Sequence, residues 1–182
     1  HIPIAKVFLK EGIQVICEKP LAVNLEDATS FANFEKEYGS IFTITYNYSR
    51  YPLIKHAREI ISNGELGKIQ SLQIEYTQDW LSEKIENKGH KQALWRTNPT
   101  RSGNGGCLAD IGTHAYHLAC FVSGLTPKAI LADLDYFVKG RKVFDNAHIL
   151  LRFFGGAKAM LWLSQIAQGS SNDLRIRIFG EK

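Results

Sequence analysis

Three side chains able to exchange a proton or bind a ligand recur within one short stretch of the chain. If residues 108–122 form an α-helix, at about 100° per residue, Asp110, His114 and His117 fall in one band along it. No Lys, Arg or Glu occurs in residues 103–126, whereas a surface helix normally carries several. We therefore expect a helix buried on more than one side, whose ionisable band needs partners or a ligand because unpaired buried charge is costly. Its apolar face would comprise Leu108, Ile111, Ala115, Leu118 and Val122.

The band admits more than one interpretation. Asp110 and His114, four residues apart, could form a structural pair on one helix face. Together with His117 and Cys107 they also offer the donor atoms of a zinc site. A role in proton transfer is the third interpretation, because histidine titrates near neutral pH. The residue types alone leave all three open.

The tripeptide Glu18-Lys19-Pro20 is the second candidate. It follows residues 13–17, an apolar and β-branched run that is typical of a buried strand in a parallel sheet. Ligands of open α/β sheets bind outside the carboxyl ends of such strands. A lysine held there by the following proline would point in a fixed direction and is suited to proton transfer. The alternative is an ordinary surface turn.

Aromatic and planar polar side chains form a third set. Carbohydrate sites commonly place aromatic faces against sugar C–H surfaces and planar polar groups against hydroxyls, so the mixture is suggestive of a sugar site. Each member could equally serve packing. The set comprises Tyr46, Asn47, Tyr48, Arg50, Tyr51, Trp80, Trp95 and Arg96.

The elements that would position Lys19 form a βαβ unit. A helix over residues 2–11 stops at Gly12, and a strand covers 13–17. Asn24, with Asp27 three residues on, begins a helix that runs to Gly39, and 41–46 is a second strand. This order implies a right-handed crossover in a parallel sheet. The apolar side of the first helix would consist of Ile4, Val7 and Phe8.

The pattern then changes to a mostly antiparallel α+β domain. Residues 69–80 alternate, with Leu72, Ile74 and Tyr76 on one face, as in a half-solvated antiparallel-type strand. Gly155-Gly156 suits a two-residue hairpin turn. The predicted elements are a helix at 52–62, a polar Lys-rich loop at 81–106, the helix at 108–122, and strands near 128–138, 146–154, 157–167 and 173–179. We expect an open sheet with helices on one face.

Composition narrows the function classes. The chain has 182 residues, 45% hydrophobic, with a formal charge of +4, which excludes a disordered or low-complexity protein. No apolar run approaches the roughly 18 residues of a membrane span, and no basic stripe indicates nucleic-acid binding. The 3 cysteines lack C-x-x-C spacing, so reduced thiols and a cytoplasmic location are expected. Because the chain starts with His1 and its only methionine is Met160, we expect a fragment or a processed chain.

Four motifs in fixed order resemble the Gfo/Idh/MocA oxidoreductase family. They are G-x-x-V-x-C-E-K-P at 12–20, N-x-x-R-Y at 47–51, G-x-L-G at 64–67 and G-G-x-L-x-D-I-G-T-H at 105–114. The resemblance implies a two-domain NAD(P)-dependent enzyme acting on sugars or polyols. An N-terminal Rossmann domain would bind the dinucleotide, and a C-terminal domain with an open sheet would contact substrate and form the oligomer interface. Residues 1–47 would then be the end of the Rossmann domain and 48–182 the substrate domain.

The resemblance also implies roles for single residues. Lys19, Asp110 and His114 would be catalytic, with His114 taking the proton of the substrate hydroxyl as hydride leaves for the nicotinamide. The cofactor, NAD or NADP, would contact Glu18, Lys19, Pro20 and Asn47. Substrate contacts would come from Lys19, Trp80, Trp95, Arg96, Asp110, His114 and His117, and no metal is expected. Gln78-Asp79-Trp80, Trp95-Arg96 and S-Q-I-A-Q-G at 164–169 resemble the branch that acts on cyclic or anhydro-sugars.

Two departures from the family pattern bear on function. His117 stands where many relatives have Asp, and G-x-G-x-x-G is missing from the sequence, so the chain alone is expected to be inactive. We expect a homodimer or homotetramer formed through the open sheet, since Leu174, Ile176 and Ile178 alternate with Arg175 and Arg177. A non-catalytic sugar-binding or assembly module and a metal-dependent sugar isomerase are the alternative functions.

Overall fold

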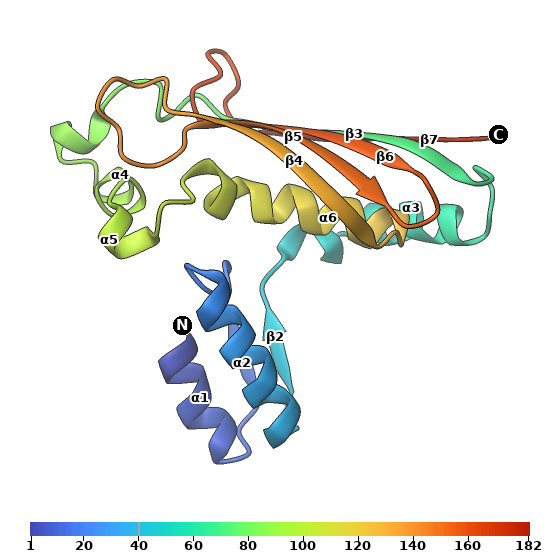
Figure 1. Ribbon diagram of the computed structural model, residues 1–182, viewed down its shortest axis with the longest axis horizontal. Coiled ribbons are helices and arrows are strands. Elements are labelled where there is room, and N and C mark those ends of the chain that lie inside the picture. Colours follow the sequence, from blue (N-terminus) through green and yellow to red (C-terminus); the bar gives the residue numbers. More distant parts are fainter. Residues whose placement is uncertain (40) are drawn as a thin grey trace. The chain divides into compact units, whose positions relative to one another are not determined.

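The computed structural model describes residues 1–39 and 41–182, which form two compact units, His1–Tyr46 and Asn47–Lys182 (Figure 1). We call them unit 1 and unit 2. The boundary between them lies one residue before the predicted domain boundary. None of the helices in the described residues is long and apolar enough to cross a membrane.

Unit 1 contains the expected βαβ arrangement. Strands β1 and β2 pair in parallel, with Val15 opposite Phe42. The Asn24 side chain accepts a hydrogen bond from the backbone N–H of Asp27 at 2.8 Å, and Gly39 ends the helix in the left-handed conformation, so both helix-end signals are confirmed. The elements are α1 (Ile2–Lys10), β1 (Val15–Cys17), α2 (Leu25–Tyr38) and β2 (Phe42–Ile44).

Within residues 1–46 the core of unit 1 is small. It consists of Ala5, Leu9 and Phe31, and the predicted apolar side of α1 is exposed in this chain. Strand β1, predicted to be buried, is covered here on one face only. Val15 packs against the core, and because side chains alternate along a strand, Ile16 points to the opposite face, where it is 78% exposed.

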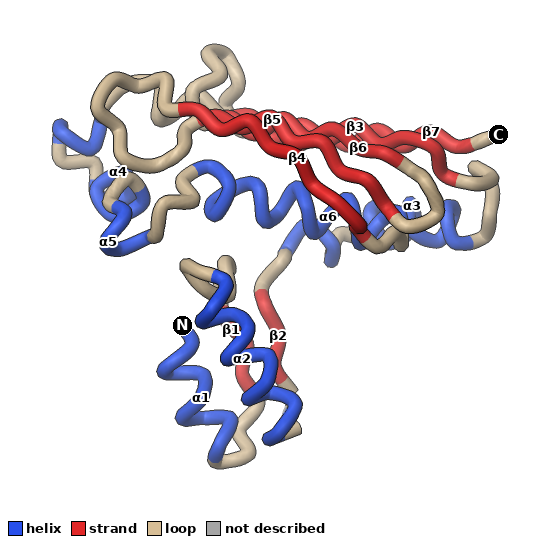
Figure 2. The backbone as a smooth tube through the Cα atoms, in the orientation of Figure 1, coloured by secondary structure: helices blue, strands red, loops and turns tan. Residues whose placement is uncertain are grey.

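Unit 2 is a five-stranded sheet with helices packed on one face, which confirms the α+β class (Figure 2). The strand order is β4-β5-β6-β3-β7. All neighbouring pairs are antiparallel except β3 and β6, which are parallel. The antiparallel-type prediction for residues 69–80 is therefore wrong on the β6 side. The strands are β3 (Ile69–Thr77), β4 (Pro127–Asp135), β5 (Asn146–Phe153), β6 (Lys158–Ser164) and β7 (Asp173–Gly180).

The core of unit 2 lies between this sheet and the helices α3 (Pro52–Ser62) and α6 (Thr113–Ser123). Leu72, Ile74 and Tyr76 of β3 are buried in it, as their alternation predicted. Residues of β5 and β6 alternate in the same way, with Ala147, Ile149, Leu151, Phe153, Ala159, Leu161 and Leu163 in the core. The sheet thus forms one contiguous core on its helix side.

Short helices replace the predicted loop at 81–106. They are the 3₁₀ turn Ile85–Lys88, α4 (Lys91–Arg96) and α5 (Pro99–Ser102). Their side-chain caps include Asn98, whose Oδ1 accepts the Thr100 N–H at 3.0 Å. Helices this short carry too few residues to show an apolar periodicity. The polar composition therefore predicted a loop, and that prediction is wrong.

The turn between β5 and β6 is longer than expected. Gly155 and Gly156 occupy it with φ of +87° and +95°, a conformation that favours glycine. However, the Gly156 N–H donates to Phe153 O at 3.2 Å and the Phe153 N–H to Ala157 O at 2.9 Å. Three residues, 154–156, therefore separate the bonded ends, and the two-residue prediction is wrong.

Candidate active site

Asp110 lies in an irregular turn rather than in the predicted α-helix. Residues Leu108–Gly112 form a π-helical turn that leads into α6, and such turns are frequent at functional sites. The turn starts from a fixed point, because the Cys107 N–H donates to Phe144 O at 2.8 Å. A Cβ at Gly106 would overlap the Phe144 backbone, so this approach requires glycine.

One oxygen of the Asp110 carboxylate accepts a hydrogen bond and also forms an ion pair. Gln165 Nε2 donates to Asp110 Oδ2 at 2.9 Å, and Arg96 Nε lies 3.3 Å from the same oxygen. Both partners of the ion pair are largely buried. The hydrogen bond and the ion pair together fix the orientation of the carboxyl group.

His114 follows one helical turn later and is 8% exposed. The Tyr48 ring meets the His114 ring edge-on, with centroids 5.1 Å apart. Tyr48 OH shares a hydrogen bond of 2.7 Å with Tyr76 OH. Burial, followed by the hydrogen bond to Tyr48, raises the pKa of Tyr76, so that phenol stays neutral beside the histidine at physiological pH.

Trp80 joins the Asp110 site through two glutamines. Its Nε1 donates to Gln78 Oε1 at 2.9 Å, and Gln165 Nε2 lies 3.4 Å from the same oxygen. Gln78 and Gln165 directly follow the paired ends of β3 and β6, Thr77 and Ser164. Because these two strands are parallel, both glutamines leave the sheet at the same edge.

Trp95 and Arg96 of α4 contact Asp110 through the Arg96 side chain. The Arg96 guanidinium stacks over the Trp95 ring at 4.2 Å. Gln92 Oε1 accepts from Trp95 Nε1 at 3.2 Å and also from Arg96 Nη1. The contacts hold Arg96 between an aromatic face and the Asp110 carboxylate.

His117 packs in a different local environment. Its ring stacks on Phe121 with centroids 6.0 Å apart. Burial, together with the positive charge of Arg50, lowers the pKa of His117 below its ordinary 6.5, which keeps the ring neutral at pH 7.

The donor atoms proposed for zinc do not form a metal site. Across residues 1–39 and 41–182 no group of three or more His, Cys, Asp or Glu side chains could hold an ion. Burial raises the pKa of the Cys107 thiol to about 12, so this sulfur is protonated at physiological pH.

The remaining predicted residues lie directly after β1 in unit 1 and at the start of unit 2. Glu18, Lys19 and Pro20 follow β1, with a cis Lys19-Pro20 peptide. Lys19 is half-buried. Asn47 begins the 3₁₀ turn Asn47–Arg50, the first element of unit 2.

These residues fit one end of a dinucleotide. A lysine at the carboxyl end of a parallel strand suits a ribose or a nicotinamide amide. Within unit 1, Lys19 after β1 has the donor chemistry that a ribose hydroxyl accepts, and residues 1–182 contain no G-x-G-x-x-G turn for a pyrophosphate.

Two protein-family models match the chain. Residues 54–182 match the GFO/IDH/MocA C-terminal domain. The chain belongs to the GFO/IDH/MocA family. Residues 1–46 match the model described as an oxidoreductase family with an NAD-binding Rossmann fold, so the family resemblance and the cofactor class predicted from the motifs are confirmed.

Individual relatives agree with this assignment. An uncharacterized oxidoreductase of Bacillus subtilis, YfiI, is 31% identical over 100% of the chain and 47% of its own length. Levoglucosan dehydrogenase of Pseudarthrobacter phenanthrenivorans is 27% identical over 99% of the chain and 50% of its length. The crystal structure of an inositol dehydrogenase homolog from Azotobacter vinelandii, complexed with NAD+, superposes with a TM-score of 0.93 at 32% identity, covering 100% of the chain and 47% of the homolog. The chain therefore spans about half the length of these relatives.

The structure brings together Arg96 and Asp110 directly, Trp95 through Arg96, and Trp80 through the glutamines. Gln78 and Gln165 were not among the predicted site residues, although each lies in a motif named above. Each glutamine directly follows a strand, but this pattern places the two side by side only if β3 and β6 are parallel.

Proposed function

We propose that the protein carrying this chain is an NAD(P)-dependent oxidoreductase that transfers a hydride between the nicotinamide and a hydroxyl of a sugar or polyol. The observation that carries the proposal is the placement of Asp110 and His114 four residues apart, on the π-helical turn and the start of α6, in a chain of this family. Asp110 is oriented by Gln165 and Arg96, and His114 is buried against Tyr48.

Each residue then has a defined task. His114 removes the proton from the reacting hydroxyl and returns it when the reaction runs toward reduction. Asp110 accepts a hydrogen bond from the sugar and fixes its orientation. Lys19 donates from its ammonium group to the reacting oxygen and to the ribose. Bound NAD(P) supplies the hydride acceptor at its nicotinamide ring.

A cyclic sugar or polyol is the substrate class we propose. Trp80 and Trp95 offer aromatic faces for the ring, while Arg96 and His117 offer polar contacts for hydroxyls. The names of two relatives, levoglucosan dehydrogenase and inositol dehydrogenase homolog, support a cyclic compound. We further assign residues 1–47 to a dinucleotide-binding domain and 48–182 to substrate binding and oligomerisation.

The open face of the sheet supports a homodimer or homotetramer. On β7, Leu174, Ile176 and Ile178 pack toward the core, so the alternation noted in the sequence reflects the core rather than a partner. Apolar groups on the other face include Leu131, Leu150 and Met160, which are all exposed and are neighbours across β4, β5 and β6. A second copy of the sheet would cover this row. The three free cysteines support a cytoplasmic location.

The function is tested in the gene product that carries this chain. Lys19→Ala should reduce sugar oxidation by about 10²–10³-fold, because the loss of one positioned donor to the reacting oxygen typically costs that much. The matched control, Lys10→Ala, changes an exposed lysine of α1 and should leave turnover unchanged.

Two outcomes would redirect the assignment. Full turnover by Lys19→Ala would show that the mechanism is wrong. Sugar binding by the wild-type protein without turnover, with either NAD or NADP, would support a non-catalytic sugar-binding module instead. The 182-residue chain by itself should show no turnover and no tight NADH binding in a fluorescence titration, since it contains no G-x-G-x-x-G turn.

A further inference from the structure

Gln165 is a buried polar side chain at the end of β6, 2% exposed. Its Nε2 contacts Asp110 Oδ2 at 2.9 Å and Gln78 Oε1 at 3.4 Å. A primary amide has two N–H donors, so one nitrogen can serve both acceptors. The carboxylate therefore receives a neutral donor, which orients it without cancelling its charge.

The backbone of Gln165 is fixed on both sides. Its N–H donates to Asp145 O at 2.9 Å, and its carbonyl accepts the Leu81 N–H at 3.0 Å. These bonds extend the sheet beyond the ends of its strands. Because the Gln165 backbone is hydrogen-bonded on both sides, its Cα is held in place, and precise positioning of a functional group requires such support.

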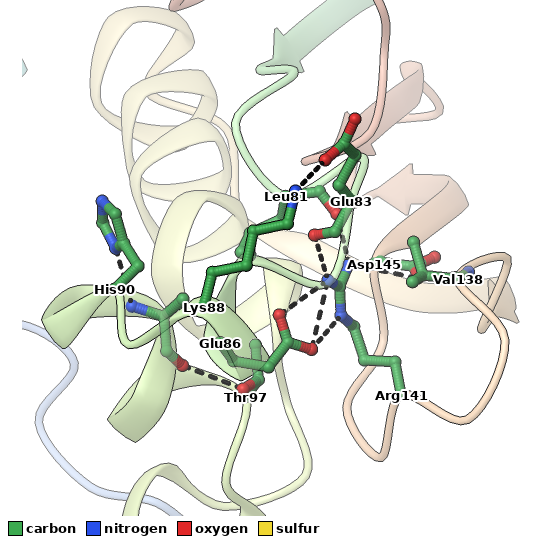
Figure 3. Close-up of polar contacts among 10 residues, drawn as sticks. Leu81, Glu83, Glu86, Lys88, His90, Thr97, Val138, Arg141 and Asp145 are labelled. Atoms are coloured by element: carbon green, nitrogen blue, oxygen red, sulfur yellow. Dashed lines mark hydrogen bonds and ion pairs between the residues drawn. The ribbon is translucent and has the colours of Figure 1, made fainter.

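Both backbone partners of Gln165 belong to a buried ionic cluster around Arg141 (Figure 3). Arg141 Nη1 donates to Leu81 O and lies 3.7 Å from Asp145 Oδ2. The side chains of Arg141 and Asp145 are 0% exposed. Glu86 completes the cluster, with its Oε2 3.2 Å from Arg141 Nη2. The fork of the guanidinium ties the segment after β3 to the loop before β5.

The same loop also fixes the other end of the contact. Asp145 accepts the backbone N–H groups of Phe137 and Val138, each at 2.9 Å. The adjacent Phe144 carbonyl receives the Cys107 N–H that starts the π-helical turn of Asp110. The turn that carries Asp110 and the backbone of Gln165 are thus both hydrogen-bonded to residues 144–145. The distance between the two side chains is therefore set by one short piece of backbone.

We propose that Gln165 is a positioning residue for Asp110, holding its carboxylate in the orientation that receives the sugar hydroxyl, with the Arg141 cluster as the frame. The inference rests on the proposed function. Arg96 and Gln165 converge on Oδ2, which fixes the plane of the carboxylate from two directions. Misplacing such a group lowers turnover without removing any group that touches the substrate.

Gln165→Leu and Gln165→Glu in the gene product that carries this chain test the inference. Leucine removes the donor, and kcat/KM for the sugar should fall roughly tenfold to a hundredfold, while KM for NAD(P) stays within about twofold of the wild type. Glutamate keeps the shape but donates only when protonated. Its kcat/KM relative to wild type should be low at pH 8 and should rise as the pH falls toward about 5, because a carboxyl group facing Asp110 then holds a proton.

Gln168→Leu is the matched control, since Gln168 is an exposed glutamine three residues further on, and it should behave as the wild type. A merely structural role for Gln165 would give losses that do not depend on pH in the glutamate variant. A pH-independent ratio for Gln165→Glu, or an unchanged kcat/KM for Gln165→Leu, would overturn the inference while leaving the proposed function standing. A wild-type protein without sugar turnover would overturn both.

Discussion

Unit 1 and unit 2 bury their apolar residues to very different extents. The core of unit 1 rests on Ala5, Leu9 and Phe31, and Ile16 in the centre of β1 is 78% exposed. The core of unit 2 draws on β3, β5, β6 and α6. Burial of apolar surface is the main stabilising term in folding, and within these 182 residues unit 2 buries far more of it than unit 1.

The difference separates two kinds of functional residue. Lys19 sits on the sparsely packed unit, whereas Asp110 and His114 sit on the densely packed one. Local opening is expected where few apolar contacts are buried. In the 182-residue chain we therefore expect amide exchange to be fast throughout unit 1 and slow in β3, β5 and β6.

The largest effect should follow from Phe31→Ala. Removing a buried phenylalanine typically costs about 3–5 kcal/mol, which exceeds what the small core of unit 1 can tolerate. Hydrogen exchange should show α1 and α2 unprotected, with the protection of β3 and β6 unchanged. If β3 and β6 also lost protection, the two units would not be energetically separate.

Arg141→Met should have the next largest effect, confined to unit 2. It leaves Asp145 and Glu86 as buried carboxylates without their cation, and breaking a buried pair costs about 3–5 kcal/mol. Urea unfolding measures the loss. Arg175→Met is the control, because Arg175 pairs with Asp173 on the surface and should give no measurable change. An equal midpoint for both variants would contradict the frame role of Arg141.

A matched pair of small truncations compares the two sheets directly. Ile74→Val removes one methylene from the core of unit 2 and should cost about 1 kcal/mol. Ile16→Val makes the same change on the exposed face of β1 and should stay within about 0.5 kcal/mol of zero. Equal losses would mean that Ile16 is covered in the protein under the conditions measured.

The smallest effect concerns pH and involves only unit 2. The folded-state pKa of His117 is lowered by burial and by Arg50, so the unfolded chain binds more protons there below about pH 6.5. This stabilising contribution is present above that pH and is lost as the pH falls toward the lower folded-state value. Comparing urea unfolding at pH 7.5 and 5.5, His117→Gln should lose less stability than the wild type. An equal loss would place the pH sensitivity elsewhere.

Local signals predicted much of the fold. Asn24 and Gly39 marked the ends of α2 because capping depends on residues a few positions apart. The alternation of Leu72, Ile74 and Tyr76 identified the buried face of β3. The parallel partner of β3 was not predictable in the same way, because pairing depends on the whole sheet rather than on one strand.

The candidate site shows the same difference between residues close in sequence, which were predicted together, and residues far apart in sequence, which were not. Asp110 and His114 lie on one continuous segment, so their spacing predicted that they lie close together. The π-helical turn left no pattern in the sequence, since it is set by the Cys107–Phe144 bond and the tight approach at Gly106. Gln165 stayed outside the predicted site because 55 residues separate it from Asp110.

The parallel β3–β6 pair has a consequence for the order of folding. Between β3 and β6 the chain runs through β4 and β5, and contacts of such long sequence separation form slowly. Gln78 and Gln165, 87 residues apart, can meet only after β6 has been made. During synthesis Asp110 and His114 emerge before β6, so Asp110 cannot acquire its glutamine partner until the chain has been made beyond that strand.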